Sequence, residues 1–258
     1  MSDATITKPR IQSVSRAIAI LRCFSDGKEH GLTEVSKMVA LHKSTTASII
    51  NTLKMEGFLE QNPRTDKFLL GLAVFTLAVN ARQDLSMICE PHLNRLLELT
   101  GETVNLAVLD HERVETVYIA KKESKQSVRI STSIGKRLPL HCTAIGKSIL
   151  ANMSKHLADE LLERLVFTPF TDRTITNKAV LLTELDMIKK RGFAYDDEEF
   201  EVGVVCVAVP ISDRFGEPIG AISVSGPLMR LDSEKRLEIA TILRSEKKEI
   251  DGKMLMLV

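Results

Sequence analysis

Residues 31–57 restrict the possible folds of this 258-residue chain more than any other segment. Apolar residues recur there at helical spacings of three and four, which predicts two short helices joined by a tight break. Thr33 and Ser44 stand just ahead of these helices and are predicted as their N-caps. The apolar stripe of the first helix is Val35, Met38 and Val39, and the residues that share the inner side of the second are Thr46, Ile49, Ile50 and Leu53.

The opposite side of the second helix carries small polar residues. Ser44, Ser48 and Asn51 share this side and are flanked by Lys43 and Thr45. Short hydroxyl and amide side chains can approach phosphates and base edges in a major groove, where a bulky or acidic surface could not. The pattern therefore predicts a DNA-binding face.

The segments around this helix pair complete a winged helix-turn-helix. An amphipathic stretch at 14–24 supplies a third helix, and runs 58–61 and 67–70 flank strong turn residues at 62–66. This predicts a two-stranded wing with Arg64 at its tip. A helical hairpin beside a β-hairpin, serving only to pack, is the alternative, but the order of all five elements favours DNA binding. The predicted DNA-contacting residues are Thr33, Lys43, Ser44, Thr45, Ser48, Asn51 and Arg64.

The charge of the chain gives only weak support for DNA binding. The formal net charge is +1, divided into +3 for residues 1–70 and −2 for the rest. A bias this small means that affinity must come from several modules binding together, which points to an oligomer.

The remaining composition excludes several classes of protein. The cysteines at 23, 89, 142 and 206 form no CxxC pair, which argues against a disulfide scaffold or a structural zinc site. There is no signal peptide and no apolar run approaching 18 residues, so we expect a soluble cytoplasmic protein that does not bind membranes. The first dozen residues are expected to form a disordered leader.

Between the two halves, residues 72–86 predict a linker helix that follows a DNA-binding domain at 10–71. Residues 84–87 break its rhythm, and Pro91 is expected near the start of another helix that ends before Gly101. The linker helix has more apolar surface than one wing could cover. This surface could pair with the same helix of a second copy in a dimer, or it could pack on the second domain of its own chain. The sequence does not favour either arrangement.

Residues 87–258 predict an α+β domain with a mostly antiparallel sheet and helices packed against it. Strands are expected at 103–109, 114–120, 128–133, 193–196, 204–210 and 218–225, and helices at 138–153, 155–165, 181–191 and from 232 onward.

Two segments of this domain predict a small binding pocket. Residues 135–147 lead into a helix whose start is rich in small residues, and free N–H groups there favour an anion. Ser223 and Ser225 point to one face of a strand, with Cys206 on its neighbour and Asp196 nearby, which could form a polar lining. In the alternative, the acidic run is a solvated surface and the serines face outward.

These segments resemble the IclR family of bacterial transcriptional regulators over nearly the whole chain. The matching motifs, in family order, are VSRAIAIL at 14–21, LTEVSKMVAL and HKSTTASIINTL at 32–53, GKRLPLHCTAIGKSILA at 135–151, RGFAYDDEE at 191–199 and GVVCVAVPISDRFG at 203–216. The resemblance implies a winged helix-turn-helix domain, a linker helix and a GAF-like effector domain. It also implies a dimer or dimer of dimers on palindromic double-stranded operators, with small organic, sugar or aromatic acids as effectors.

The resemblance also implies the effector contacts. Family positions fall on Leu138, Ala144, Ile145, Asp196, Cys206, Ser223 and Ser225. One departure is Ala47-Ser48, where many members carry a larger or basic residue, so we expect fewer base contacts. Aromatic residues are scarce near these positions in the sequence, which mildly disfavours an aromatic effector.

Three functions follow from these observations. The favoured one is a ligand-responsive regulator without a cofactor, repressing a catabolic operon under a small organic or sugar acid, or else activating such an operon. The second is a metal-responsive regulator using Asp196, Cys206 and His141. The third is an enzyme with Cys142 or Cys206 as nucleophile and His141 as base.

Overall fold

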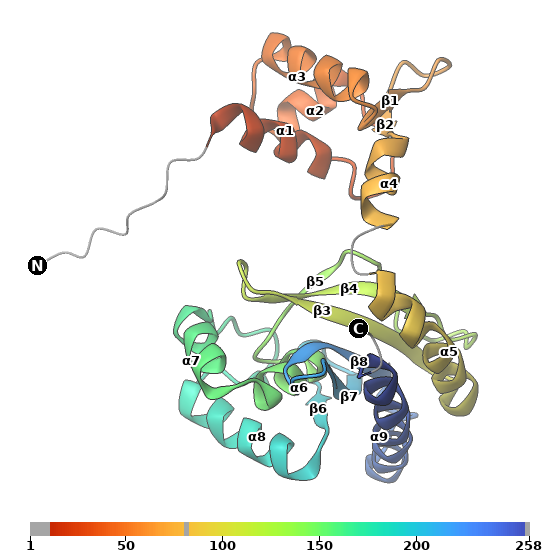
Figure 1. Cartoon of the computed structure of the whole chain (residues 1–258), viewed down its shortest axis with the longest axis vertical. Coiled ribbons are helices and arrows are strands. Elements are labelled where there is room, and N and C mark those ends of the chain that lie inside the picture. The colour runs from red at the N-terminus through yellow and green to blue at the C-terminus, as the bar shows by residue number, and fades with distance from the viewer. Residues whose placement is uncertain (1–10, 80–82, 256–258) are drawn as a thin grey trace, which may run out of the picture. The chain divides into compact units, whose positions relative to one another are not determined.

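The computed structural model describes residues 11–79 and 83–255 and contains two units, Met1–Gln83 and Asp84–Val258 (Figure 1). The predicted leader falls mostly on residues 1–10, which lie outside the described residues, while Gln12 already begins a helix. No described helix combines the length and the apolar character needed to cross a membrane.

The first unit has the predicted winged helix-turn-helix order. Helices α1 (Gln12–Arg22), α2 (Leu32–Met38) and α3 (Lys43–Met55) precede an antiparallel hairpin of β1 (Leu59–Gln61) and β2 (Phe68–Leu70). Its core is formed by the buried apolar residues Ile20, Phe24, Val35, Ile50, Leu53, Leu59 and Phe68. The α3 stripe is buried at Ile50 and Leu53, as the helical periodicity predicted, whereas Met38 of the predicted α2 stripe and Val14 and Ile18 of α1 are exposed.

The two predicted N-caps are wrong. Helix α2 begins at Leu32 with Gly31 as its N-cap, and the Glu34 carboxylate accepts a 2.7 Å hydrogen bond from Gly31 N. Because this side chain already satisfies a free donor at the helix start, the helix begins before Thr33. Helix α3 likewise begins with His42 as its N-cap, which places Ser44 inside the first turn.

The connection between the units differs from the predicted linker helix at 72–86. Helix α4 spans Leu72–Val79, and α5 spans Gln83–Thr100, so residues 83–86 belong to the second helix. Pro91 lies in the interior of α5, not near its start. The buried stripe Leu85, Cys89, Leu93 and Leu96 continues through this position, so packing outweighs the helix-breaking tendency of the exposed proline.

The second unit contains a six-stranded antiparallel sheet in the order β5-β4-β3-β8-β7-β6. The strands are β3 (Thr103–Asp110), β4 (Glu115–Lys122), β5 (Arg137–Pro139), β6 (Ala194–Asp197), β7 (Val204–Ser212) and β8 (Pro218–Pro227). The predicted α+β class and the antiparallel sheet are therefore confirmed.

One predicted strand is absent from the described sheet. Residues 128–133 form an irregular segment, and the strand lies later in the chain, at β5. Side chains of β3 hold this segment in place: Thr103 Oγ1 donates to Ile130 O at 3.0 Å, and Asn105 Oδ1 accepts from Thr132 Oγ1 at 2.6 Å. Because these side-chain bonds replace a backbone ladder, the β-rich composition of the segment was misleading.

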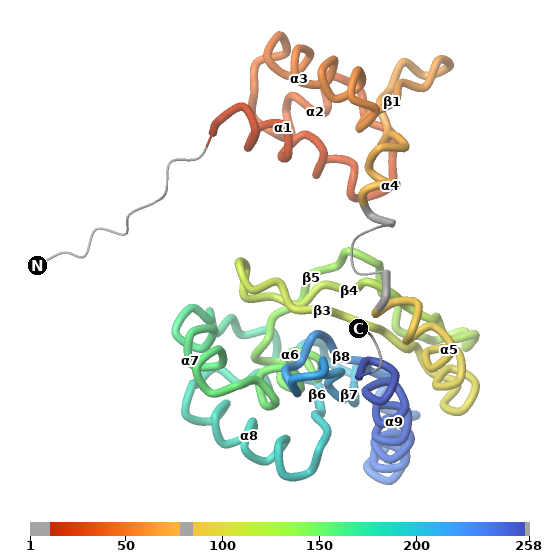
Figure 2. Tube along the Cα trace, viewed as in Figure 1, coloured from red at the N-terminus to blue at the C-terminus, as the bar shows by residue number. Residues whose placement is uncertain are grey.

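Helices cover both faces of the sheet (Figure 2). On one face, α6 (Ala144–Asn152), α7 (Lys155–Arg164) and α8 (Lys178–Arg191) enclose an apolar cluster with Ala107, Ala208 and Ala221 of the sheet. On the other face, α5 and α9 (Ser233–Met254) enclose a second cluster rich in valine, leucine and isoleucine. The sheet thus separates two cores that differ in the size of their strand side chains.

Candidate functional site

Helix α3 presents the predicted polar face to solvent. Thr46, Ile50 and Leu53 are buried, while Ser44 and Ser48 lie exposed on the other side. The first intrahelical bond runs from Thr46 N to His42 O, so the earlier N–H groups of α3 point out of the helix start. Small hydroxyls beside free N–H groups suit a close approach to phosphates.

The remaining predicted DNA contacts are also accessible. Of these, Lys43, Asn51 and Thr33 are exposed, and Thr45 is half-buried. Arg64 is exposed in the turn between β1 and β2, where its backbone N–H donates a 2.9 Å hydrogen bond to Asn62 Oδ1. The unit therefore carries the seven predicted residues on α2, α3 and the hairpin turn.

Glu29, which the sequence pattern did not identify, forms hydrogen bonds with the turn of the wing. Glu29 accepts from Asn62 Nδ2 at 2.5 Å and from Thr65 Oγ1 at 2.8 Å, joining the segment before α2 to the turn. These two hydrogen bonds lower the pKa of Glu29. The contacts span more than thirty residues of sequence, so local spacing gave no signal of them.

In the second unit, one small cavity of about 50 Å³ collects the predicted effector contacts. It lies on the sheet face that α6 covers. Tyr118, Phe200 and Lys136 also line it, as does the irregular segment through Ile130 and Thr132. The aromatic lining corrects the expectation that aromatic side chains are scarce around this site. The predicted residues lining the cavity are Leu138, Ala144, Ile145, Asp196, Cys206, Ser223 and Ser225.

Sheet register brings the polar residues together. Asp196 of β6 pairs with Cys206 of β7, and Cys206 pairs with Ser225 of β8. Ser223 lies two residues before Ser225 and therefore on the same face. The two serines are buried, which excludes the alternative in which they face solvent.

The start of α6 forms another wall of the cavity. Thr143 caps the helix, its Oγ1 accepting from Gly146 N at 3.1 Å. A Cβ atom at position 146 would lie 2.4 Å from Leu140 Cα, so only glycine allows the helix to approach the preceding segment this closely. This contact sets Ala144 and Ile145, with their helix-start N–H groups, against the cavity.

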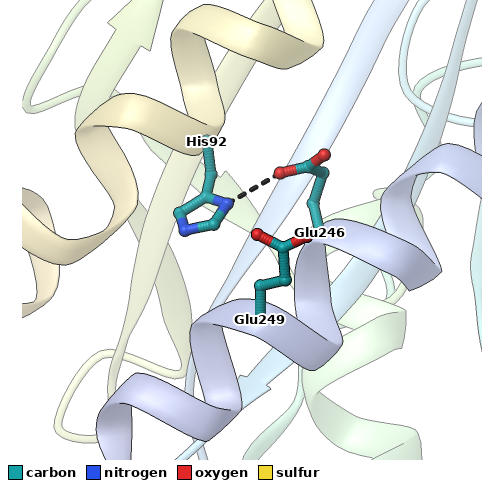
Figure 3. Close-up of side chains that lie close together, drawn as sticks. All are labelled: His92, Glu246 and Glu249. Atoms are coloured by element: carbon teal, nitrogen blue, oxygen red, sulfur yellow. Dashed lines mark hydrogen bonds and ion pairs between the residues drawn. The ribbon is translucent and has the colours of Figure 1, made fainter.

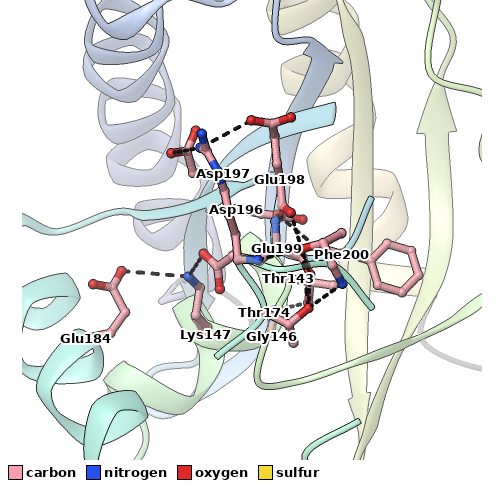
Figure 4. Close-up of polar contacts among 12 residues, drawn as sticks. Thr143, Gly146, Lys147, Thr174, Glu184, Asp196, Asp197, Glu198, Glu199 and Phe200 are labelled. Carbon is pink, nitrogen blue, oxygen red and sulfur yellow. Dashed lines mark hydrogen bonds and ion pairs between the residues drawn. The ribbon is translucent and has the colours of Figure 1, made fainter. Parts of the chain in front are cut away.

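Buried charges surround Asp196 (Figure 4). Asp196 Oδ1 accepts hydrogen bonds from Glu199 N at 2.8 Å and from Phe200 N at 3.3 Å. Burial, together with the charge of Glu199, raises the pKa of Asp196 to about 7. Lys147 of α6 pairs with Glu199 and lies 3.8 Å from a carboxylate oxygen of Glu184. The cavity therefore contains a carboxyl group whose charge state changes near neutral pH.

Sequence reasoning missed Lys147 and Glu199. Lysine 147 lies in an otherwise small and apolar helix and is almost fully buried, which is unusual for a lysine. That isolated charge was the available signal. Glu199 lies in an acidic run whose other members are mostly part-exposed, so nothing in the sequence distinguishes it.

The thiol chemistry considered from the sequence has no support in the geometry. Burial raises the pKa of both Cys142 and Cys206, so these thiols stay protonated and poorly nucleophilic. His141 Nε2 lies 3.0 Å from the backbone carbonyl oxygen of Thr168. This ring nitrogen is therefore hydrogen-bonded to the backbone and not to a thiol.

The metal set considered from the sequence is not assembled either. Within the described residues, the ligand-type group whose atoms lie within 4.8 Å of one another is His92, Glu246 and Glu249 (Figure 3). His92 Nδ1 is 2.7 Å from Glu246, and His92 Nε2 is 2.8 Å from Lys253 Nζ. Both ring nitrogens of His92 already have a hydrogen-bond partner, and the partner of Nε2 is a lysine ammonium group, which would repel a metal ion. We therefore interpret this cluster as a polar network that joins α5 to α9.

Comparison with known proteins gives consistent similarities. Residues 13–63 match the model of the IclR helix-turn-helix domain, and residues 77–252 match that of the bacterial transcriptional regulator IclR C-terminal domain. The chain is 34% identical to the HTH-type transcriptional regulator KdgR of Escherichia coli, covering 98% of this chain and 97% of that protein. It is 32% identical to the transcriptional repressor IclR of Escherichia coli, covering 93% and 89%.

Solved structures share the fold. The Thermotoga maritima IclR structure matches with a TM-score of 0.78 at 31% identity, covering 95% of this chain and 100% of that one. An IclR homologue from Microbacterium hydrocarbonoxydans, complexed with 4-hydroxybenzoate, matches with a TM-score of 0.83 at 24% identity, covering 94% and 99%.

Proposed function

Because this chain belongs to the IclR family of bacterial transcriptional regulators, whose helix-turn-helix domain binds DNA, we propose that it represses a catabolic operon under the control of a small acid. The family resemblance found in the sequence motifs is thereby confirmed, and the relatives are transcriptional regulators, not enzymes. The observation that carries the proposal is that the seven expected effector contacts line one small cavity.

The proposed effector is a small organic or sugar acid. The cavity offers hydroxyls from Ser223 and Ser225, helix-start N–H groups of α6, and the Asp196 carboxyl. At about 50 Å³ it is far smaller than a typical ligand pocket of roughly 300 Å³ or more. An acid therefore enters by pushing apart the segment 130–136 and the start of α6. Such a displacement favours one of two arrangements of the protein and so alters DNA binding.

The proposed DNA contacts are those of α2, α3 and the wing, and the proposed assembly is a dimer or dimer of dimers on a palindromic operator. Leu72, Phe75 and Leu77 of α4 are each at least 60% exposed, so this helix has an apolar surface that a second copy could cover. The face of α3 contains few basic residues, so one DNA-binding unit alone would bind DNA weakly. Simultaneous binding by the DNA-binding units of several copies would raise the affinity of the assembly for DNA.

The DNA-binding part is tested by retardation of the DNA upstream of the gene at low salt. We expect Ser44→Ala with Arg64→Ala to weaken binding at least tenfold, because a groove contact and a phosphate contact are lost. Ser127→Ala with Arg214→Ala, which removes the same groups from exposed positions of the second unit, is the matched control. Equal binding by all three proteins would refute the assignment of these contacts.

The regulatory part is tested in cells and in solution. Deletion of the gene should raise expression of the adjacent operon, whereas a fall would make the protein an activator. In solution, gluconate, pyruvate or 4-hydroxybenzoate should raise the melting temperature and release DNA, because a ligand that binds only the folded state stabilises it. If none of these acids has any effect, the proposed effector class is wrong.

A further inference from the structure

Asn105 of β3 contains a polar group that the fold leaves unsatisfied. The residue is 0% exposed, and its Oδ1 accepts a 2.6 Å hydrogen bond from Thr132 Oγ1. Its Nδ2 has no hydrogen-bond partner among the described residues. An unpaired buried donor loses its hydration without replacement, at a cost of about 1–3 kcal/mol. An amide kept in this state needs an explanation beyond stability.

Strand alternation places Asn105 on the face that forms the cavity. Its neighbours Val104 and Leu106 belong to the apolar cluster under α5 and α9. Ala107 and Leu109 belong to the cluster under α6. Because side chains two residues apart share a face of a strand, Asn105 points to the α6 side with Ala107 and Leu109.

The neighbours of Asn105 on that face line the cavity. Ser223 lies directly opposite it on β8, and such pairs have Cβ atoms about 5 Å apart. Ser223 and Thr132 both line the cavity, and Thr132 O accepts a 2.6 Å hydrogen bond from Lys121 Nζ. Lys121 in turn lies opposite Asn105 on β4. The unpaired amide therefore lies at the edge of the cavity, covered by the segment that contains Thr132.

We propose that Asn105 extends the effector site beneath Thr132, where its side-chain amide donates a hydrogen bond to an acceptor oxygen of the bound acid. The inference rests on the proposed function and adds to it a contact and an orientation. The free donors here are the amide of Asn105 and the hydroxyl of Ser223. The ammonium group of Lys121, which bonds Thr132 O and pairs with Glu123, adds positive charge next to the covering segment. This set recognises a carboxylate or keto oxygen. The acid is thus oriented with this oxygen toward β3.

The same geometry explains how the site opens. With the cavity at about 50 Å³, Thr132 seals Asn105 from the interior space. When Thr132 moves away, Asn105 Nδ2 gains the acceptor that it lacks in the closed state. Binding therefore satisfies a donor that folding left unpaired, and this gain is available only when an acceptor oxygen arrives.

The test measures binding of the acid probe by calorimetry, using whichever of gluconate, pyruvate and 4-hydroxybenzoate binds the unchanged protein most tightly. Asn105→Asp keeps the acceptor for Thr132 but replaces the donor by an acceptor, so we expect at least tenfold weaker binding. Asn94→Asp makes the same change at an exposed position of α5, on the other side of the sheet, and should bind within twofold of the unchanged protein.

A second variant guards against misfolding of the first. Asn105→Leu with Thr132→Val replaces both partners by apolar groups, which is expected to leave the melting temperature of the ligand-free protein unchanged or higher. The same double variant should bind the probe at least tenfold more weakly. Binding within twofold by either Asn105 variant would overturn the inference while leaving the effector cavity intact. Absence of binding by the unchanged protein to all three acids would instead overturn the proposed effector class, and this inference with it.

Discussion

Lys147 of α6 forms an ion pair with Glu199, and the side chains of both residues are buried in the second unit. Glu184 of α8 stands 3.8 Å from the same ammonium group and also pairs with Arg191 at 2.7 Å. A chain of alternating charges thus runs from Glu199, whose backbone N–H bonds Asp196, to the end of α8. Its members depend on one another, because a charge left alone in such a site is strongly disfavoured.

Lys147→Met is expected to lower the free energy of unfolding by about 3–5 kcal/mol, because it leaves Glu199 buried without its counter-ion. Urea denaturation measures the change. Adding Glu199→Met should restore most of the loss, since replacing both partners by apolar groups is often neutral. Lys178→Met breaks an exposed pair with Glu163 and serves as control, with no measurable loss expected. Equal stability of the unchanged protein and Lys147→Met would show that the pair contributes nothing.

The stability of the protein should depend on pH through Asp196. Its pKa is raised to about 7 by burial and by Glu199, whereas an unfolded aspartate titrates near ~3.9. Between these values the folded protein holds a proton that the unfolded chain has released. The free energy of unfolding therefore falls as pH rises, by up to ~1.4 kcal/mol per unit from this group.

Asp196→Asn should remove this contribution. Chemical denaturation over about pH 5–8 is expected to show a flatter profile for the variant, which becomes the more stable protein at the alkaline end. The amide oxygen still accepts the hydrogen bonds from Glu199 N and Phe200 N, so local structure is kept. Parallel profiles for the two proteins would mean that Asp196 titrates elsewhere.

Gly146→Ala should destabilise the second unit. The added Cβ would lie 2.4 Å from Leu140 Cα and 2.5 Å from Leu140 O, so backbone must move, at a cost of about 1–3 kcal/mol or more. Thermal unfolding measures the loss. Gly252→Ala of α9 is the matched control, because nothing lies within 4 Å of its Cβ and alanine favours helix by up to ~1 kcal/mol. A melting temperature for Gly146→Ala as high as that of Gly252→Ala would contradict the close contact.

Glu29→Ala should loosen the wing. Without the carboxylate that binds Asn62 and Thr65, amide hydrogens at residues 62–67 are expected to exchange faster, while those of β3 keep their rates. Hydrogen exchange followed by mass spectrometry reports both regions at once. Glu56→Ala, an exposed change at the end of α3, should leave the wing as it was. If the amide exchange rates at residues 62–67 are the same in Glu29→Ala as in the unchanged protein, the hairpin does not depend on the hydrogen bonds of Glu29.

The parts of the fold that were predictable are those set by local periodicity. The stripe of Thr46, Ile50 and Leu53 specifies α3, and the turn residues around Arg64 specify the wing. Features that depend on contacts between distant segments could not be predicted from local sequence. One example is the packing that keeps α5 helical on both sides of Pro91. The irregular segment at 128–133 is another, because its hydrogen bonds are made with side chains distant in sequence, among them Thr103 and Asn105 of β3.

The candidate site was predicted in the same uneven way. Alternation along one strand and the family motifs identified Ser223, Ser225 and Asp196. The burial of Lys147 and the unpaired amide of Asn105 are visible only once strands and helices are assembled. Such features arise from three-dimensional packing, which a single sequence does not encode in short-range patterns.

The two faces of the sheet have a consequence for how relatives of this protein could diversify. The strand positions under α5 and α9 are mostly valine, leucine and isoleucine, whereas the central strands β7 and β8 carry small residues on the α6 face, at Cys206, Ala208, Ala221, Ser223 and Ser225. Substitutions at the small polar positions therefore change the lining of the cavity with little loss of folding stability. A gene duplicate could acquire a cavity of different shape and polarity through a few such substitutions, while the aliphatic face, and the strand order it maintains, stayed the same.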